Sequence, residues 1–128
     1  MEPITLEATK RCPEINFDFA ANTFLIKGES YPEDVDSFYG EIIEALETHL
    51  ESQQGATIRL DLELIYFNSS TAKVLMELFE MMDAAAERGN DVLVAWHYEA
   101  DDDNMEELGG EFAEELAHAR FELKVLET

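Results

Sequence analysis

The chain is 128 residues long and 46% hydrophobic, which is enough for one domain with a hydrophobic core. Its 30 acidic and 8 basic side chains give a formal net charge of −22, so we expect neither nucleic acid nor an anionic membrane surface as a partner. The single cysteine, Cys12, excludes an internal disulfide, and no apolar run has membrane-spanning length. Residues 1–3 do not begin a signal peptide, so we expect residues 1–128 to form a single cytoplasmic domain.

The N-terminal residues predict a β-hairpin preceded by a segment with two interpretations. Within residues 1–14, Ile4 to Leu6 fit either a short edge strand or a loosely held arm. Apolar residues then occupy every second position from Ile15 to Phe19 and from Phe24 to Ile26. This spacing predicts two strands joined by a turn at residues 20–22.

A first amphipathic helix is predicted after residues 28–33, whose sequence is Gly-Glu-Ser-Tyr-Pro-Glu. Ser30 and Glu33 have the spacing of a capping box, and Pro32 is tolerated in a first helical turn. Apolar residues recur on one face as far as Leu50, and the glutamates between them are expected to be solvated.

Residues 57–89 predict a strand, a polar junction and a second helix. Apolar and charged residues alternate from Thr57 to Leu64, and an apolar run continues through residue 67. The polar residues 68–71 follow, and from Ala72 the apolar spacing becomes helical until Gly89, which is placed to end the helix. Apolar residues surround most of this helix, which predicts either deep burial or an apolar face for a partner.

The remaining residues predict a strand, a helix and a final strand. The apolar run from Val92 to Trp96 is typical of an interior strand. Glu99 to Asn104 form an acidic segment, but it lacks the glycine and distal glutamate of an EF-hand, so it predicts a solvated loop that caps a helix. That helix is expected from Met105 to Leu116, and the alternation from Phe121 to Val125 predicts a strand.

This order of elements predicts an α/β fold. We expect a mixed sheet of about four to five strands, in which an N-terminal β-hairpin is continued by parallel crossovers. Three main helices are expected to pack on this sheet.

The polar junction at residues 68–71 is the best candidate for a functional site. A helix start needs a capping side chain, because its first amides lack partners, but one such residue suffices. The functional interpretation is that one of these hydroxyls is phosphorylated. A phosphoryl group there would lie close to unpaired backbone amides and to the positive end of the helix dipole, which stabilise its negative charge. Lys73 fits either an ordinary surface lysine or a partner for such an anion. The residues alone leave both interpretations open.

A resemblance to known proteins starts from this junction. Asn68-Ser69-Ser70 before an apolar helix is similar to the phosphorylation segment of STAS domains of the anti-sigma-factor-antagonist type, whose pattern is Asp-Ser-Ser followed by glycine and leucine. Here Asn68 replaces the acidic residue, and Thr71-Ala72 replace glycine and leucine. The chain more closely resembles the SiaC family of regulatory phosphoproteins, which are STAS-like. That resemblance rests on residues 28–33, 64–70 and 96–98, in the family's order and over nearly the whole chain.

The resemblance implies a single STAS-like domain without catalysis, cofactor or metal of its own. In the family a protein kinase phosphorylates a hydroxyl after the strand, and a metal-dependent protein phosphatase removes the group. The unmodified form binds and activates an effector, a diguanylate cyclase, which implies a role in cyclic-di-GMP signalling and biofilm control. The phosphoacceptor implied here is Ser69, with Ser70 and Thr71 as fallbacks, and the implied partner surface is Asn68, Ser69, Ser70, Thr71, Lys73 and Tyr31.

Two other classes stay open. One is an acidic adaptor that works without phosphorylation, in which Ser69 is only part of a helix start. The other is a small hydrolase using Ser69 and His97, although the sequence has no nucleophile elbow or phosphate-binding loop. We expect His97, at a strand end, to be a hydrogen-bonded structural residue rather than a base or metal ligand.

Overall fold

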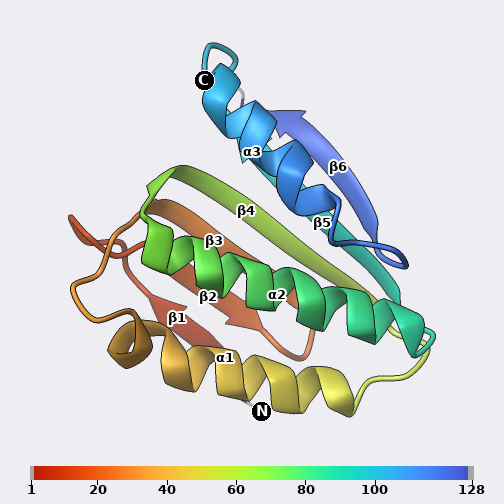
Figure 1. Cartoon of the computed structure of the whole chain (residues 1–128). Helices are drawn as coiled ribbons and strands as arrows, with labels where there is room; N and C mark the ends of the chain where they lie inside the picture. The colour runs from red at the N-terminus through yellow and green to blue at the C-terminus, as the bar shows by residue number, and fades with distance from the viewer. Residues whose placement is uncertain (1, 127–128) are drawn as a thin grey trace.

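Six β-strands form one sheet in the computed structural model, which describes residues 2–126 (Figure 1). The strands are β1 (Ile4–Leu6), β2 (Glu14–Asp18), β3 (Thr23–Ser30), β4 (Thr57–Phe67), β5 (Asp91–Tyr98) and β6 (Arg120–Val125). The helices are α1 (Val35–Glu51), α2 (Ser69–Glu87) and α3 (Asp103–Ala113). The predicted mixed α/β fold with three helices is confirmed, but the sheet has six strands where four to five were expected.

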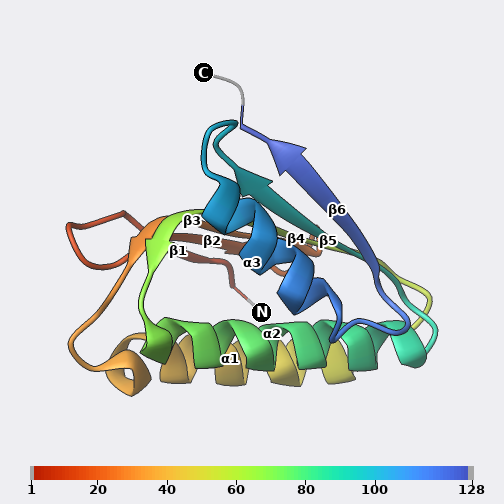
Figure 2. The ribbon, with the colours of Figure 1, turned by 45° about the horizontal axis from the view of Figure 1, so that its top comes forward.

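The strands lie in the sheet in the same order as in the chain. β1, β2 and β3 pair antiparallel, whereas β3, β4, β5 and β6 pair in parallel. The additional strand is β1, because Ile4 pairs with Phe17 at the edge of the sheet, so the edge-strand interpretation is correct. Each parallel connection contains one helix, and since such crossovers share one hand, all three helices cover the same face (Figures 1 and 2).

The core lies between this face of the sheet and the helices. The alternating apolar residues of β4 point into it and are buried: Ile58, Leu60, Leu62 and Leu64. Under α3 the core is aromatic, because the Trp96 ring stacks on Phe112 with centroids 5.5 Å apart. The Trp96 Nε1 also donates a hydrogen bond of 3.0 Å to the Met105 carbonyl oxygen. These contacts hold α3 against the end of β5.

The start of α1 differs from the sequence prediction. The helix begins at Val35, and the Asp34 side chain caps it by accepting a hydrogen bond of 3.2 Å from the Ser37 backbone N–H. The predicted capping box is wrong, because Ser30 ends β3 and its hydroxyl is buried in the core. Pro32 accordingly precedes the helix and does not lie in its first turn.

At α3 the acidic loop provides the cap, as predicted. The Asp102 side chain accepts a hydrogen bond of 3.0 Å from the Met105 backbone N–H. The loop after α3 is fastened to α2, because one Asp83 carboxylate oxygen accepts the backbone N–H groups of residues 117, 118 and 119 at 2.9, 2.7 and 2.9 Å. Burial by itself would raise the pKa of Asp83, but the three donors stabilise the carboxylate and lower its pKa overall.

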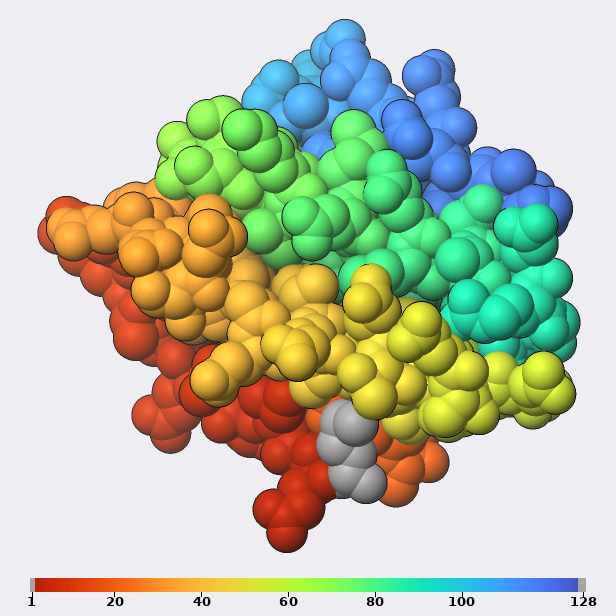
Figure 3. All heavy atoms as spheres, turned by 60° about the horizontal axis from the view of Figure 1, so that its bottom comes forward, coloured from red at the N-terminus to blue at the C-terminus, as the bar shows by residue number. Residues whose placement is uncertain are grey.

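The two faces of the molecule differ in charge. Exposed glutamates lie along all three helices, at positions 41, 44, 47, 51, 77, 80, 87, 106, 107 and 111. Within the helices Lys73 is the only lysine or arginine, whereas Lys27, Arg59, Arg120 and Lys124 lie on strands. Side chains alternate along strands, so these four project from the face without helices. The helical face, which Figure 3 shows with α1 and α2 side by side, is therefore the strongly acidic one.

Candidate functional site

A β-bulge shapes the approach to the polar junction. Gly28 pairs with Leu64 but Glu29 pairs with Tyr66, so Ile65 is an extra residue in β4. The bulge shifts the alternation by one position, since without it Tyr66 would point into the core. Tyr66 is instead 51% exposed, and the Phe67 ring faces Trp96 at a centroid distance of 6.1 Å.

Asn68 starts α2 by capping it. Its side-chain oxygen accepts a hydrogen bond of 2.9 Å from the Thr71 backbone N–H. The helix therefore begins at Ser69, three residues earlier than the sequence predicts, and both serines lie in its first turn. Ser69 and Ser70 are exposed. Their backbone N–H groups belong to the first turn, which has no intrahelical acceptors and carries the positive end of the dipole.

Thr71 differs from the two serines because its side chain is fully buried. Its hydroxyl donates a hydrogen bond of 3.1 Å to the Ser30 carbonyl oxygen and lies 2.9 Å from the Ser30 hydroxyl. The Ser30 hydroxyl is also 2.7 Å from the Tyr39 hydroxyl, and burial raises the pKa of Tyr39 to about 12. This chain of hydroxyls ties the first turn of α2 to β3 and α1.

The other residues expected at the partner surface lie around the same helix start. Lys73 is exposed and follows Ser69 by four positions, so the two side chains are neighbours on α2. Tyr31 is half-buried and meets Tyr66 edge to face at a centroid distance of 5.8 Å. The six predicted residues thus cluster, with Ser69, Ser70 and Lys73 on the outside and Thr71 inside.

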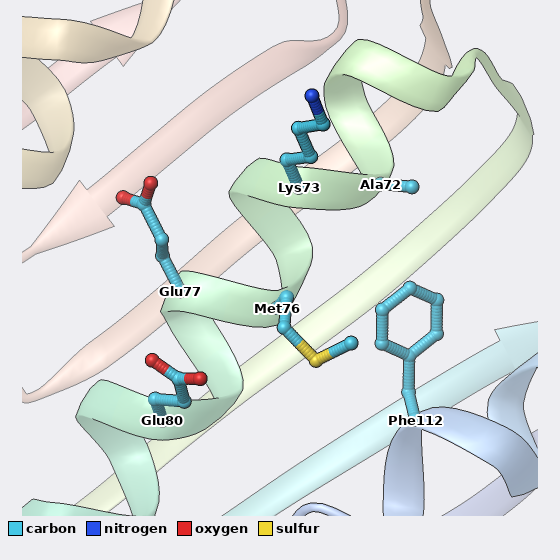
Figure 4. A pocket seen from close by; sticks show the side chains of 6 residues that line it. All are labelled: Ala72, Lys73, Met76, Glu77, Glu80 and Phe112. Atoms are coloured by element: carbon cyan, nitrogen blue, oxygen red, sulfur yellow. The ribbon is translucent and has the colours of Figure 1, made fainter.

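A groove between α2 and α3 continues from this cluster. It comprises two adjoining hollows of about 300 and 160 Å³. The apolar lining, here called the groove floor, is Phe67, Ala72, Met76, Leu108 and Phe112. The charged lining, here called the groove rim, is Lys73, Glu77, Glu80 and Glu111. Figure 4 shows the Met76 side chain lying towards the Phe112 ring, while Lys73 and Glu77 point away from α3.

The groove was not predicted from the sequence. α2 is apolar around most of its circumference, and nothing in the chain order shows which apolar residue α3 leaves uncovered. Met76 is 37% exposed, unlike its helix neighbours Leu75 and Phe79, which are buried. The apolar circumference of α2 predicted either deep burial or an apolar face for a partner, and the second alternative was the one signal that pointed to the groove.

His97 lies on the sheet and is hydrogen-bonded, as predicted. Its Nε2 is 2.8 Å from one Asp61 carboxylate oxygen, and the Arg59 guanidinium donates to the same carboxylate at 2.8 and 3.1 Å. Although burial acts in the opposite direction, these two neighbours lower the pKa of Asp61. Within residues 2–126 no group of three or more His, Cys, Asp or Glu side chains is arranged to hold a metal ion. None of the helices in the same range is long and apolar enough to cross a membrane.

Comparisons with known proteins agree with this arrangement. An uncharacterized protein of Pseudomonas aeruginosa (strain UCBPP-PA14) is 31% identical over 117 residues, covering 91% of this chain and 92% of that protein. The crystal structure of apo-SiaC from Pseudomonas aeruginosa superposes with a TM-score of 0.87 at 31% identity, covering 97% and 99% of the two chains. A crystal structure of the diguanylate cyclase SiaD with its activator SiaC, from the same organism, matches with a TM-score of 0.89 at 29% identity over 96% and 99%.

The family itself follows from a match along almost the entire length. The model of the SiaC family of regulatory phosphoproteins matches residues 6–126, a range that includes the polar junction, the groove and all six strands except the first two residues of β1. The chain therefore belongs to the SiaC family of regulatory phosphoproteins.

Proposed function

We propose that this protein is a non-catalytic switch whose unmodified form binds and activates a diguanylate cyclase. A protein kinase transfers the γ-phosphoryl group of ATP to the Ser69 hydroxyl, releasing ADP and a proton. A metal-dependent phosphatase hydrolyses the phosphoester with water and releases phosphate. The similarity to SiaC bound to the cyclase SiaD supports the choice of effector. The proposal treats residues 1–128 as one domain with cyclic-di-GMP synthesis, and through it biofilm formation, as the controlled output.

One observation carries this proposal. The exposed Ser69 lies at the first position of α2, at the end of a groove with an apolar floor. An apolar surface that is open to solvent favours a protein partner, and a dianion beside it changes the cost of burying that surface. Ser70 is the fallback acceptor. Thr71 is the weakest candidate, because a kinase would have to break its buried hydrogen bonds to reach it.

The surroundings of Ser69 explain how a phosphoryl group is tolerated and what it changes. Free N–H groups in the first turn, together with Lys73 four positions on, stabilise the added negative charge within the protein. A partner has to remove water from this surface in order to bind, and the hydrated dianion makes that removal costly. A loss of about 3 kcal/mol of binding free energy would weaken the complex more than a hundredfold, which is enough for a switch.

The supporting residues have separate roles in this proposal. Ser69, Ser70, Lys73 and Tyr31 contact the partner, whereas Asn68 and Thr71 position the helix start from behind. Catalysis is assigned to the partners, because His97 pairs with Asp61 on the sheet face without helices, whereas Ser69 starts α2 on the other face.

The test is cyclic-di-GMP synthesis by each diguanylate cyclase of the host, purified and assayed with and without this protein. Unmodified protein and Ser69→Ala should stimulate one cyclase. Protein carrying phosphoserine at position 69, or Ser69→Asp, should bind it about a hundredfold more weakly by calorimetry.

Ser70→Asp is the matched control, because it adds the same charge one residue further along the exposed first turn. It should weaken binding less than Ser69→Asp. Stimulation of none of the cyclases, or equal binding by Ser69→Asp and Ser69→Ala, would contradict the proposal. Circular dichroism of each variant checks that the fold is intact.

A further inference from the structure

The outer edge of β6 is a free edge of the sheet (Figure 1). β6 is the last strand in the sheet order, and within residues 2–126 no strand pairs with its outer side. It pairs with β5 in unbroken register from Arg120 to Val125, without a proline or a bulge. Proteins usually protect free edges with prolines, bulges or very short strands, and the strand at the opposite edge, β1, has only three residues. β6 is therefore the edge at which a further strand can add.

The backbone groups that point away from β5 belong to every second residue of β6. The Leu126 backbone N–H donates a hydrogen bond of 2.7 Å to the Tyr98 carbonyl oxygen, so this N–H points towards β5. Successive residues of a strand point their N–H and C=O groups to alternate sides, so those of Phe121, Leu123 and Val125 point outwards. These groups are available to a further strand.

The side chains of the same three residues form an apolar row beside the edge. The Phe121 ring lies 6.3 Å from the ring of Phe79 in α2, so this row is on the helical face of the sheet. Leu123 is 42% exposed and Val125 is 49% exposed. Exposed apolar surface of this kind is costly to leave in water, and an added strand with its own apolar row would cover it.

The charged residues of β6 indicate that the added strand is β6 of a second copy. Glu122 and Lys124 alternate with the apolar row, and the Lys124 ammonium lies 3.4 Å from the Glu122 carboxylate. When two copies of β6 pair antiparallel about Leu123, Glu122 of each copy lies opposite Lys124 of the other. The two neighbouring registers that also match the outward backbone groups place Glu122 opposite Glu122, or Lys124 opposite Lys124. The strand is therefore complementary to itself in one register.

We propose that the protein forms a two-fold dimer through this edge. Leu123 of each copy lies at the centre, Phe121 pairs with Val125 on either side, and each outward N–H donates to an outward carbonyl oxygen of the other copy. The two-fold axis is perpendicular to the sheet, so the helices of both copies cover the same face. The inference does not rest on the proposed function, because Ser69 follows β4, which lies two strands away from this edge.

The dimer is expected to be weak. One strand edge buries less surface than the roughly 800 Å² per partner of a standard stable interface. The net charge of −22 on each copy adds repulsion, which salt screens. We therefore expect a dissociation constant of about 0.1 mM in about 0.3 M sodium chloride, and weaker association at low salt.

The test is sedimentation equilibrium of the full chain, at protein concentrations up to about 1 mM in the same salt. Amide hydrogen exchange, measured by NMR at low and at high protein concentration, locates the contact. The amides of Phe121, Leu123 and Val125 should gain protection as the concentration rises. Those of Glu122 and Lys124 already face β5 and should change less.

Charge reversals test the register. Glu122→Lys places lysines opposite lysines, and Lys124→Glu places glutamates opposite glutamates, so each variant alone should weaken the dimer about tenfold. An equimolar mixture of the two variants should associate about as tightly as the wild type, and so should the double variant, in which the two charges are exchanged. Glu41→Lys on α1 and Lys27→Glu on β3 make the same changes of net charge away from the edge. They should alter the affinity by less than about threefold.

Three results would overturn the inference. The first is a protein that stays monomeric at about 1 mM in about 0.3 M sodium chloride. The second is tighter self-association of Glu122→Lys than of the wild type, which would show that net charge and not strand pairing controls association. The third is a dimer whose amide protection does not alternate along β6, which would place the contact elsewhere. Circular dichroism of each variant checks that the fold is intact.

Discussion

Three hydroxyl side chains in the first turn of α2 have different surroundings. Ser69 and Ser70 face solvent, whereas Thr71 contacts Ser30, which lies 41 positions earlier in the chain. The sequence showed that a polar junction precedes an apolar helix, and Asn68 as a capping residue fits that expectation. It did not show which hydroxyl is inside, because burial here depends on a partner from β3. The residue-level prediction of Ser69 as phosphoacceptor stays a prediction.

The buried hydroxyl chain makes stability sensitive to alkaline pH. Because burial raises the pKa of Tyr39 from 10.0 to about 12, the unfolded chain loses the phenolic proton first as pH rises. The stabilisation that the buried Tyr39 phenol gives the folded state is complete below pH 10. It declines between pH 10 and 12, by at most about 3 kcal/mol. Tyr39→Phe should flatten this decline in urea denaturation followed by Trp96 fluorescence.

Thr71→Val is the control for this experiment. It removes a hydroxyl from the same chain but keeps the Tyr39 phenol, so it should lower stability at all pH values and retain the alkaline decline. An unchanged decline in Tyr39→Phe would contradict the assignment.

At the scale of elements, α3 is placed by a close contact with β5. A Cβ atom built on Gly109 would lie 2.6 Å from Cδ1 of Trp96, which is shorter than any tolerated contact. Gly109 and Gly110 both have low helix propensity, and the sequence alone does not distinguish them. Only the crossing of the helix over the Trp96 ring does so.

Gly109→Ala should destabilise the protein by about 1–3 kcal/mol, because α3 or the Trp96 ring has to move. Gly110→Ala, with open space around its Cβ position, should instead stabilise it by up to about 1 kcal/mol through helix propensity. Urea denaturation of both variants measures the difference. Equal effects of the two substitutions would show that the contact with Trp96 does not position α3.

The strands were predicted better than the helix starts, for a physical reason. Alternation along β4 reflects burial on one face and is visible in a single segment. A cap depends on which of several polar residues the chain turns at, so Ser30 and Glu33 matched a capping box while Asp34 caps the helix. The sequence did not decide between an edge strand and a loosely held arm for β1, because three residues are too few to show alternation.

For the whole molecule, the excess of acidic side chains lies mainly on the helical face. Lys27, Arg59, Arg120 and Lys124 project from the opposite face, and three of them form ion pairs there: Arg59 with Asp61, Arg120 with Asp91, and Lys124 with Glu122. The net charge of −22 was known from composition, but its separation between faces required the sheet topology. The groove could not be predicted without knowing also how α2 and α3 pack together.

Repulsion among the helix carboxylates should make stability depend on salt. Raising sodium chloride from about 0.02 to about 0.3 M screens charges over distances that separate neighbouring glutamates. A gain of about 1 kcal/mol would raise Tm by roughly 3–6 °C for a domain of this size, measured by calorimetry. The combined substitutions Glu41→Gln, Glu44→Gln and Glu47→Gln should reduce the salt effect. A Tm that does not change with salt in the wild-type protein would show that repulsion is unimportant.

The extra residue in β4 has a consequence for how this sequence can vary in length. Ile65 sets the phase of the two aromatic residues that follow, so Phe67 packs on Trp96 while Tyr66 faces outward. Deleting Ile65 would remove the bulge but keep Tyr66 paired with Glu29 and Phe67 paired with Ser30, because these pairs follow in regular register from Gly28 and Leu64. Position 65 is thus the place in this segment where the loss of one residue disturbs the strand pairing least, and Ser69 would keep its spacing from Phe67.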